Sequence, residues 1–220
     1  RAGIAYKPSW NNDMLFRLSG GVYVQPPFYR ELRMFDGSLV KPENATTQKS
    51  YQVVLTHEYN FIAWDRPFVL TSELYYKYLK DIIPYEVDNI RIRYYADQKA
   101  TGYATGLDVR LNGEFVKGID SWASVSIMKS AENIKYYLSP TGNILSQSQI
   151  DNGAEYVCDT IIKGIPRPSD QRINFSLFFQ DYLPYIPSFK VNLKMIFGTG
   201  MPFGTPYGER YTQKMRMSAY

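Results

Sequence analysis

Apolar and polar residues alternate along two segments near the end of the chain, RINFSLFFQ (172–180) and FKVNLKMIF (189–197). In the first segment the odd-numbered positions, which form one parity, hold Ile173, Phe175, Leu177 and Phe179. Phe178 is the one apolar residue of the even-numbered parity. A period of two is typical of β-strands with one apolar and one polar face. The two segments, joined by a short Pro-rich connection, therefore predict a β-hairpin.

The same alternation occurs in six further segments, and no amphipathic helix of useful length is expected. The segments are 2–7, which is partial, and 14–25, 51–61, 68–80, 102–115 and 122–130. Most are nearer to a dozen residues than to the five or six that are common in soluble sandwiches. A dozen residues rising roughly 3.3 Å each, tilted by about 40°, would cover some 30 Å, the apolar thickness of a membrane. The apolar face is therefore expected to meet lipid, and the polar face a wet interior.

The connections between these segments alternate between short and long. The short ones are 8–13, 63–67, 116–121 and 183–188, and the long ones are 26–50, 81–101, 131–170 and 199 onward. Tight turns at one rim and long loops at the other are typical of antiparallel outer-membrane barrels.

All three tryptophans, Trp10, Trp64 and Trp122, fall in or beside short connections. They are accompanied there by Phe61, Phe68, Phe115, Tyr182, Tyr185 and Phe189. Aromatic rings favour the membrane interface, so the pattern predicts an aromatic belt at the short-turn rim. The second belt would come from Tyr51, Tyr76, Tyr78 and Tyr103. The alternative is that aromatic residues simply favour strands.

Charged side chains occupy the polar parity of nearly every predicted strand. They are Arg17, Glu58, Glu73, Lys77, Asp108, Arg110, Glu114, Arg172, Lys190 and Lys194. In a dry core each would cost several kcal/mol of uncompensated desolvation. These residues need water, paired partners or a polar plug, which favours a large wet barrel over a small filled one.

Composition excludes several other classes of protein. The 220 residues are 45% hydrophobic and carry a net charge of +4, without a basic stripe that would favour a nucleic-acid partner. No apolar run approaches the roughly 20 residues of a membrane helix. Cys158 is the only cysteine, so no internal disulfide can form, and no metal or other cofactor is expected. The first residues, RAGIAYKP, have no signal-peptide pattern, so an export signal is expected to have been removed or to lie outside this sequence.

An enzymatic role is not expected. Hydrolysis of the Ser/His kind needs a histidine near a nucleophile, and the single histidine, His57, shares the apolar parity of Val53 and Leu55. The acidic residues are scattered singly along different strands.

The segment FRLSGGVYVQPPFYREL (16–32) resembles a stretch of TonB-dependent receptors, in which a strand with an Arg and small residues leads into a Pro-aromatic-x-Glu-Leu element. IAYKP (4–8), IPRPSDQRINFSLFFQDYLP (165–184) and GTGMPFGTP (198–206) are also similar to the C-terminal half of such a receptor's barrel. The resemblance covers most of the chain, with the loops as its least specific part.

The resemblance implies an all-β, transmembrane antiparallel β-barrel in the cell outer membrane, of which residues 1–220 supply about eight of 22 strands. The implied function is energy-coupled import of a scarce solute such as a siderophore, cobalamin or a glycan. Implied partners are outer-membrane lipid, the receptor's own plug domain and remaining strands, the TonB system acting through the plug, the imported small molecule or oligosaccharide, and a surface lipoprotein. An outer loop is expected over 207–220.

Two groups of residues are candidates for the site. Contacts with the plug or lumen are expected from Arg17, Tyr23, Gln25, Arg30 and Glu31. The alternative for these is an ordinary role in stabilising loop and rim. Ligand contacts in the long loops are conceivable for Tyr85, Tyr94, Tyr95, Tyr136 and Tyr137, although packing of these tyrosines against one another is the preferred interpretation. Two other classes stay open: a small outer-membrane barrel of structural, adhesive or enzymatic role, and a soluble carbohydrate-binding or adhesion sandwich.

Overall fold

The computed structural model describes residues 1–10, 13–33, 38–40, 46–88, 91–96, 98–138, 140, 144–145, 153, 155–156, 158–183 and 185–202. These residues form strands and connections without a helix, so the all-β, antiparallel expectation is confirmed. No helix in this part of the chain could span a membrane. The outer loop expected over 207–220 lies outside the described residues.

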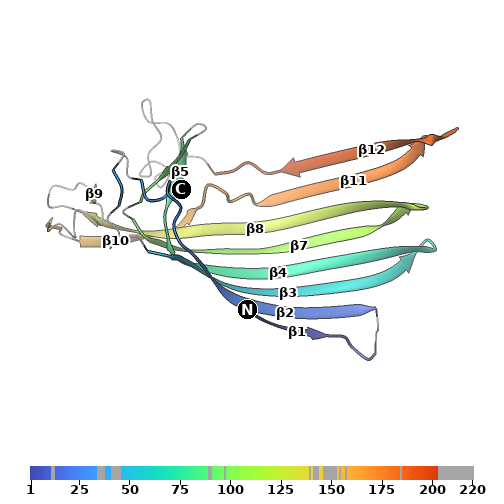
Figure 1. The fold of residues 1–220 in the computed structure, drawn as a ribbon, viewed down its shortest axis with the longest axis horizontal. Helices are drawn as coiled ribbons and strands as arrows, with labels where there is room; N and C mark the ends of the chain where they lie inside the picture. Colours follow the sequence, from blue (N-terminus) through green and yellow to red (C-terminus); the bar gives the residue numbers. More distant parts are fainter. Residues whose placement is uncertain are drawn as a thin grey trace.

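Eight strands lie side by side in the order of the sequence, each antiparallel to the next (Figure 1). They are β1 (Ala2–Tyr6), β2 (Met14–Gln25), β3 (Gln48–Ala63), β4 (Arg66–Ile82), β7 (Ala100–Val116), β8 (Ile119–Leu138), β11 (Ile173–Leu183) and β12 (Ile186–Gly198). Each corresponds to one of the eight segments predicted from the alternation. The short connections gather at one end of the sheet, opposite β5 and β10 (Figure 1).

Two-residue turns join β3 to β4 and β7 to β8 at the short-turn end. Trp64 and Asp65, between β3 and β4, both have positive φ (51° and 56°), as the central residues of a type I′ turn do. Between β7 and β8, Gly118 has φ of 74°, a conformation that glycine adopts without steric cost. The type I′ turn matches the twist of β3 and β4 and fixes their register.

The long connections contain structure that the alternation did not predict. Within 81–101, β5 (Tyr85–Asp88) pairs with β6 (Arg91–Tyr94) as a separate hairpin. Within 131–170, β9 (Ile144–Leu145) and β10 (Cys158–Pro166) both pair with β8. The expectation of a loop from residue 131 was therefore wrong, because β8 continues to Leu138 and is the longest strand, with 20 residues.

Residues directly opposite one another in neighbouring strands share a face of the sheet, so the register separates two faces. One aliphatic row crosses seven strands: Ile4, Leu18, Leu55, Leu74, Leu107, Ile127 and Ile173. One polar row crosses the other face: Arg17, Thr56, Glu73, Asp108, Ser126 and Asn174. The two surfaces are called the apolar face and the polar face below.

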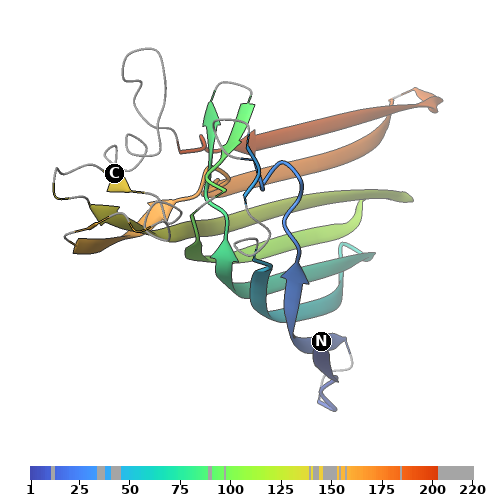
Figure 2. The same cartoon turned by 60° about the vertical axis from the view of Figure 1, so that its left-hand side comes forward.

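The sheet curves without closing (Figure 2). Among the described residues, β1 has only β2 as a neighbour and β12 only β11, and these two strands lie on opposite sides of the sheet (Figure 1). The backbone groups on two edges are therefore left without strand partners in this part of the chain.

Aromatic side chains gather at both ends of the apolar face. At the short-turn end Phe68 packs against Phe61, Trp64 and Phe115, with ring centroids 5.2 to 5.8 Å apart. Trp122 and Tyr182, expected in the same belt, instead lie on the polar face, opposite Asn112 and Lys190. Trp122 also explains the exceptional Phe178, because the two are directly paired and their rings are 6.2 Å apart.

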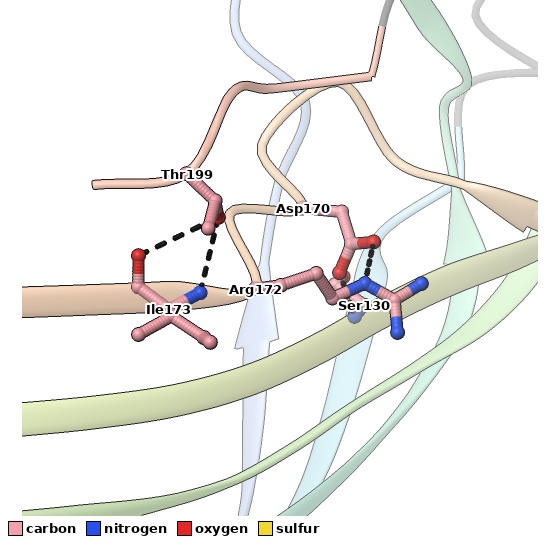
Figure 3. Close-up of polar contacts among 5 residues, drawn as sticks. All are labelled: Ser130, Asp170, Arg172, Ile173 and Thr199. Atoms are coloured by element: carbon pink, nitrogen blue, oxygen red, sulfur yellow. Dashed lines mark hydrogen bonds and ion pairs between the residues drawn. The ribbon is translucent and has the colours of Figure 1, made fainter.

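A carboxylate completes the sheet where the neighbour of β8 changes. On this edge of β8, residues 122–127 pair with β11, and residues 131–138 pair with β10. Between them the buried Asp170 accepts a hydrogen bond from the Ser130 N–H at 2.5 Å and one from Arg172 Nε at 2.8 Å (Figure 3). The side chain of Asp170 thus supplies an acceptor that a strand would otherwise provide.

Candidate functional site

The polar face carries charge along its length, and two of its acidic residues lie side by side. Glu73 and Asp108 are directly opposite one another, an arrangement of like charges that is unfavourable unless water or a counter-charge is close. Glu73 accepts a hydrogen bond from the Thr56 hydroxyl at 3.1 Å. Arg17 lies 3.9 Å from Glu58, and this exposed ion pair contributes little stability.

A pocket of about 520 Å³ lies on the polar face towards the long connections. Its polar lining consists of Tyr23, Gln25, Gln48, Lys49, Ser50, Gln52 and Arg167. Tyr23 belongs to β2, whereas Arg167 follows β10 and pairs with Glu132 of β8. Strands β3, β4 and β7 separate β2 from β8, so the shared pocket shows that the sheet curves towards its polar face.

The pocket offers hydrogen-bonding groups rather than reactive ones. Gln52 Nε2 donates to Ser50 Oγ at 2.9 Å, and Gln48 Nε2 donates to Glu31 Oε2 at 3.0 Å. Each glutamine amide retains further donor and acceptor capacity. Amides, a hydroxyl, a phenol and one guanidinium can bind and orient a polar solute or a polar protein segment.

Arg167 is held in place from two sides. Its Nε lies 3.5 Å from Oε2 of Glu132, which is 0% exposed, so the contact is an ion pair between partly and fully buried groups. Its guanidinium also lies over the ring of Tyr85, 5.7 Å from the centroid. A buried carboxylate requires such a partner, and the pair fixes the cation at the pocket wall.

The connection after β2 is tied to the rest of the site through Glu31. The Glu31 carboxylate accepts hydrogen bonds from the Phe28 N–H at 2.9 Å and from the Gln48 side chain of β3. Glu31 thus stabilises this turn, and a contact between Glu31 and a plug stays a prediction.

Tyr94 lies close to this turn. Burial raises the pKa of the Tyr94 phenol above its ordinary value of 10.0, and the nearby Glu31 and Tyr85 raise it further, whereas Arg30 lowers it. The turn after β2 and the β5–β6 hairpin therefore meet at the long-loop end of the polar face.

The structure brings together some of the residues predicted for the site. Tyr23 and Gln25 line the pocket, whereas Arg17 lies on the same face further along β2. Arg30, Glu31 and Tyr94 lie at the rim, and Tyr85 contacts Arg167. Tyr95 belongs to the turn after β6, where its N–H bonds to the Pro84 carbonyl at 2.9 Å.

The loop tyrosines pack chiefly with other side chains. The Tyr85 and Tyr94 rings are 5.9 Å apart, and Tyr137 contacts Tyr156 at 5.1 Å. Tyr137 does not line the pocket, and the side chain of Tyr136 lies outside the described part of the chain.

Sequence reasoning missed Gln48, Ser50, Gln52 and Arg167. Gln52 alternates in step with Glu58 on the polar side of the segment 51–61, which is the signal that could have identified it. Arg167 gave no such signal, because its position depends on how the long connection folds back.

Within the described residues no group of three His, Cys, Asp or Glu side chains could hold a metal ion. Comparison of the chain with protein-family models, with curated proteins and with solved structures finds no match.

Proposed function

We propose that this chain forms part of the wall of an outer-membrane β-barrel, and that the barrel is a TonB-dependent receptor importing a scarce solute such as a siderophore, cobalamin or a glycan. One observation carries the proposal. The face of the sheet that is more exposed is the apolar one, and the face that is more covered is the charged one.

Side chains in the middle of β3 and β4 illustrate this inversion. Val53 is 53% exposed, Leu55 43%, Leu74 55% and Tyr76 51%. On the opposite face Gln52, Thr56, Glu73 and Lys77 are half-buried. In water an apolar surface that crosses seven strands would be strongly unfavourable. Lipid is the partner that matches a whole face of this kind, and water in a lumen would solvate the other.

The unpaired edges of β1 and β12 support a larger barrel. An open edge is not viable in lipid, because each unpaired N–H and C=O would cost several kcal/mol. Further strands from the same receptor would pair with both edges and enclose the polar face.

Within that barrel, the pocket and its rim would bind the solute or the plug. Solute or the receptor's plug would contact Tyr23, Gln25 and Arg167, with Arg30 and Glu31 at the rim. The energy for transport would come from the TonB system through the plug, so no covalent chemistry is required of this wall.

Deletion of the gene followed by growth under solute limitation tests the importer directly. Cells lacking the protein should grow more slowly on a limiting source of iron, cobalamin or one glycan, and the wild-type gene should restore growth. Substitution of Arg167 by Ala should reproduce part of the defect while the protein remains in the outer membrane. Equal growth of the deletion strain on all three sources would overturn the importer.

A further inference from the structure

The apolar face contains a groove of about 680 Å³ near its long-loop end, between β1, β2, β3 and β4. It is lined by Ala2, Gly20, Val22, Val53, Tyr76 and Tyr78, together with neighbouring residues. Ala2, Gly20, Val53 and Tyr76 are directly opposite one another in consecutive strands. The two smallest residues of this row create the hollow beside the large Tyr76 ring. Such a groove fits a flexible hydrocarbon chain.

Two lysines lie just beyond the groove on the same face. Along β3 the apolar parity runs from Val53 through Tyr51 to Lys49, and along β4 it runs from Tyr76 through Tyr78 to Lys80. Tyr51 and Tyr78 are paired, with ring centroids 6.2 Å apart, and Lys49 and Lys80 are paired next to them. At roughly 3.3 Å per residue the lysines begin about 13 Å from the centre of the groove.

A negatively charged partner would stabilise the Lys49–Lys80 pair. Like charges directly opposite one another destabilise a sheet. In the described part of the chain no ion pair joins either ammonium group to a carboxylate. A phosphate between the two ammonium groups would turn this repulsion into two favourable contacts, since lysine binds phosphate as a point charge. The order along the strands is therefore hydrocarbon groove, tyrosine pair, cation pair.

We infer that this part of the apolar face binds a membrane lipid with a phosphorylated headgroup, its acyl chain in the Gly20 groove and its phosphate between Lys49 and Lys80. The inference rests on the proposed membrane location and adds a specific partner to it. Lys49 also lines the polar pocket, but the lipid would lie on the apolar face and no solute takes part.

Lipid titration of the full chain tests this site. The protein, purified in detergent from outer membranes, is titrated with dioleoylphosphatidylglycerol, dioleoylglycerol or inorganic phosphate, and bound lipid is counted by native mass spectrometry. We expect the phosphorylated lipid to bind best and inorganic phosphate to bind far more weakly, because the groove contributes to binding. Lys49→Gln with Lys80→Gln should weaken phosphatidylglycerol binding about thirtyfold, with little effect on dioleoylglycerol.

Two controls test the placement of the charge. Lys49→Arg with Lys80→Arg should retain binding, and Lys77→Gln, which removes a lysine from the polar face of β4, should leave it unchanged. Equal phosphatidylglycerol binding by the Lys49→Gln, Lys80→Gln variant and the wild type would overturn the lipid site while leaving the membrane location intact. The same loss in Lys77→Gln would also overturn it. Recovery of the protein in aqueous buffer without detergent would instead contradict the proposed function itself.

Discussion

The two faces of the main sheet differ in chemistry and in exposure, and the apolar face is the more exposed of the two. The apolar face crosses seven strands with aliphatic side chains such as Leu55 and Leu74, which are about half exposed. The polar face carries Glu73 and Asp108, and the long connections supply Arg167 to its pocket. A sheet folded for water places these faces the other way round. This arrangement supports the proposal that the surroundings of the apolar face, rather than an internal core, stabilise the sheet.

The largest contrast is expected from a charge placed on either face of the same strand. Leu55→Arg should reduce the stability of the protein in lipid vesicles by about 2–4 kcal/mol if the site is near the membrane midplane. Thr56→Arg should cost much less, because Glu73 lies directly opposite on β4 and offsets the repulsion from Arg17, which lies directly opposite on β2. Urea titration of both variants in vesicles measures the difference. Leu193→Arg and Asn192→Arg provide the same contrast in β12, because Leu193 lies opposite Phe179 and Asn192 opposite Gln180. Equal effects within each pair would argue against this assignment of the faces.

A smaller loss of stability is expected when the buried Asp170 is replaced. Asp170→Ala should cost about 1–3 kcal/mol, because the Ser130 N–H would lose its acceptor in a buried position. Asp170→Asn keeps an acceptor oxygen and should recover part of the loss. Hydrogen exchange of the Ser130 amide reports the change locally. If Asp170→Ala leaves that amide as protected as in the wild type, the carboxylate does not complete the edge of β8.

The smallest effect is expected from the ionisation of Tyr94, at the rim of the pocket. The folded-state pKa of Tyr94 is raised above 10.0, so its stabilising contribution is present below pH 10 and is lost as the pH rises through the folded pKa. Absorbance at the tyrosinate band should therefore show a late-titrating component that Tyr94→Phe reduces by one group. Glu31→Gln should shift that group towards lower pH. An unchanged titration in Tyr94→Phe would assign the late group to another tyrosine.

The alternation predicted the eight strands of the main sheet because most of each strand has apolar residues on one face and polar residues on the other. It failed for the end of β8, where Ala131 is 2% exposed and Glu132 and Ile134 are 0% exposed. There both faces are covered, so the sequence no longer alternates. Phe178 departs from the pattern for a related reason, since it packs on Trp122 across the polar face.

The candidate pocket was predictable only in part. Tyr23 and Gln25 follow from strand parity, because a strand side chain must point to one face or the other. Arg167 does not, since its place depends on the path of a long connection and on the buried Glu132 that it meets. Local patterns determine which face a residue occupies, whereas contacts between connections determine which residues share a pocket.

The central claim is that the apolar face meets lipid, and spin labels on both faces test it most directly. Labels are placed on single cysteines at Val53, Leu55 and Leu74 and at Gln52, Thr56 and Glu73, in a Cys158→Ser background reconstituted in vesicles. Collision rates with oxygen, which concentrates in lipid, and with a water-soluble nickel complex are then measured. We expect labels at the first three positions to collide mainly with oxygen and labels at the other three mainly with nickel. Nickel accessibility at Val53, Leu55 and Leu74 equal to that on the polar face would contradict the account.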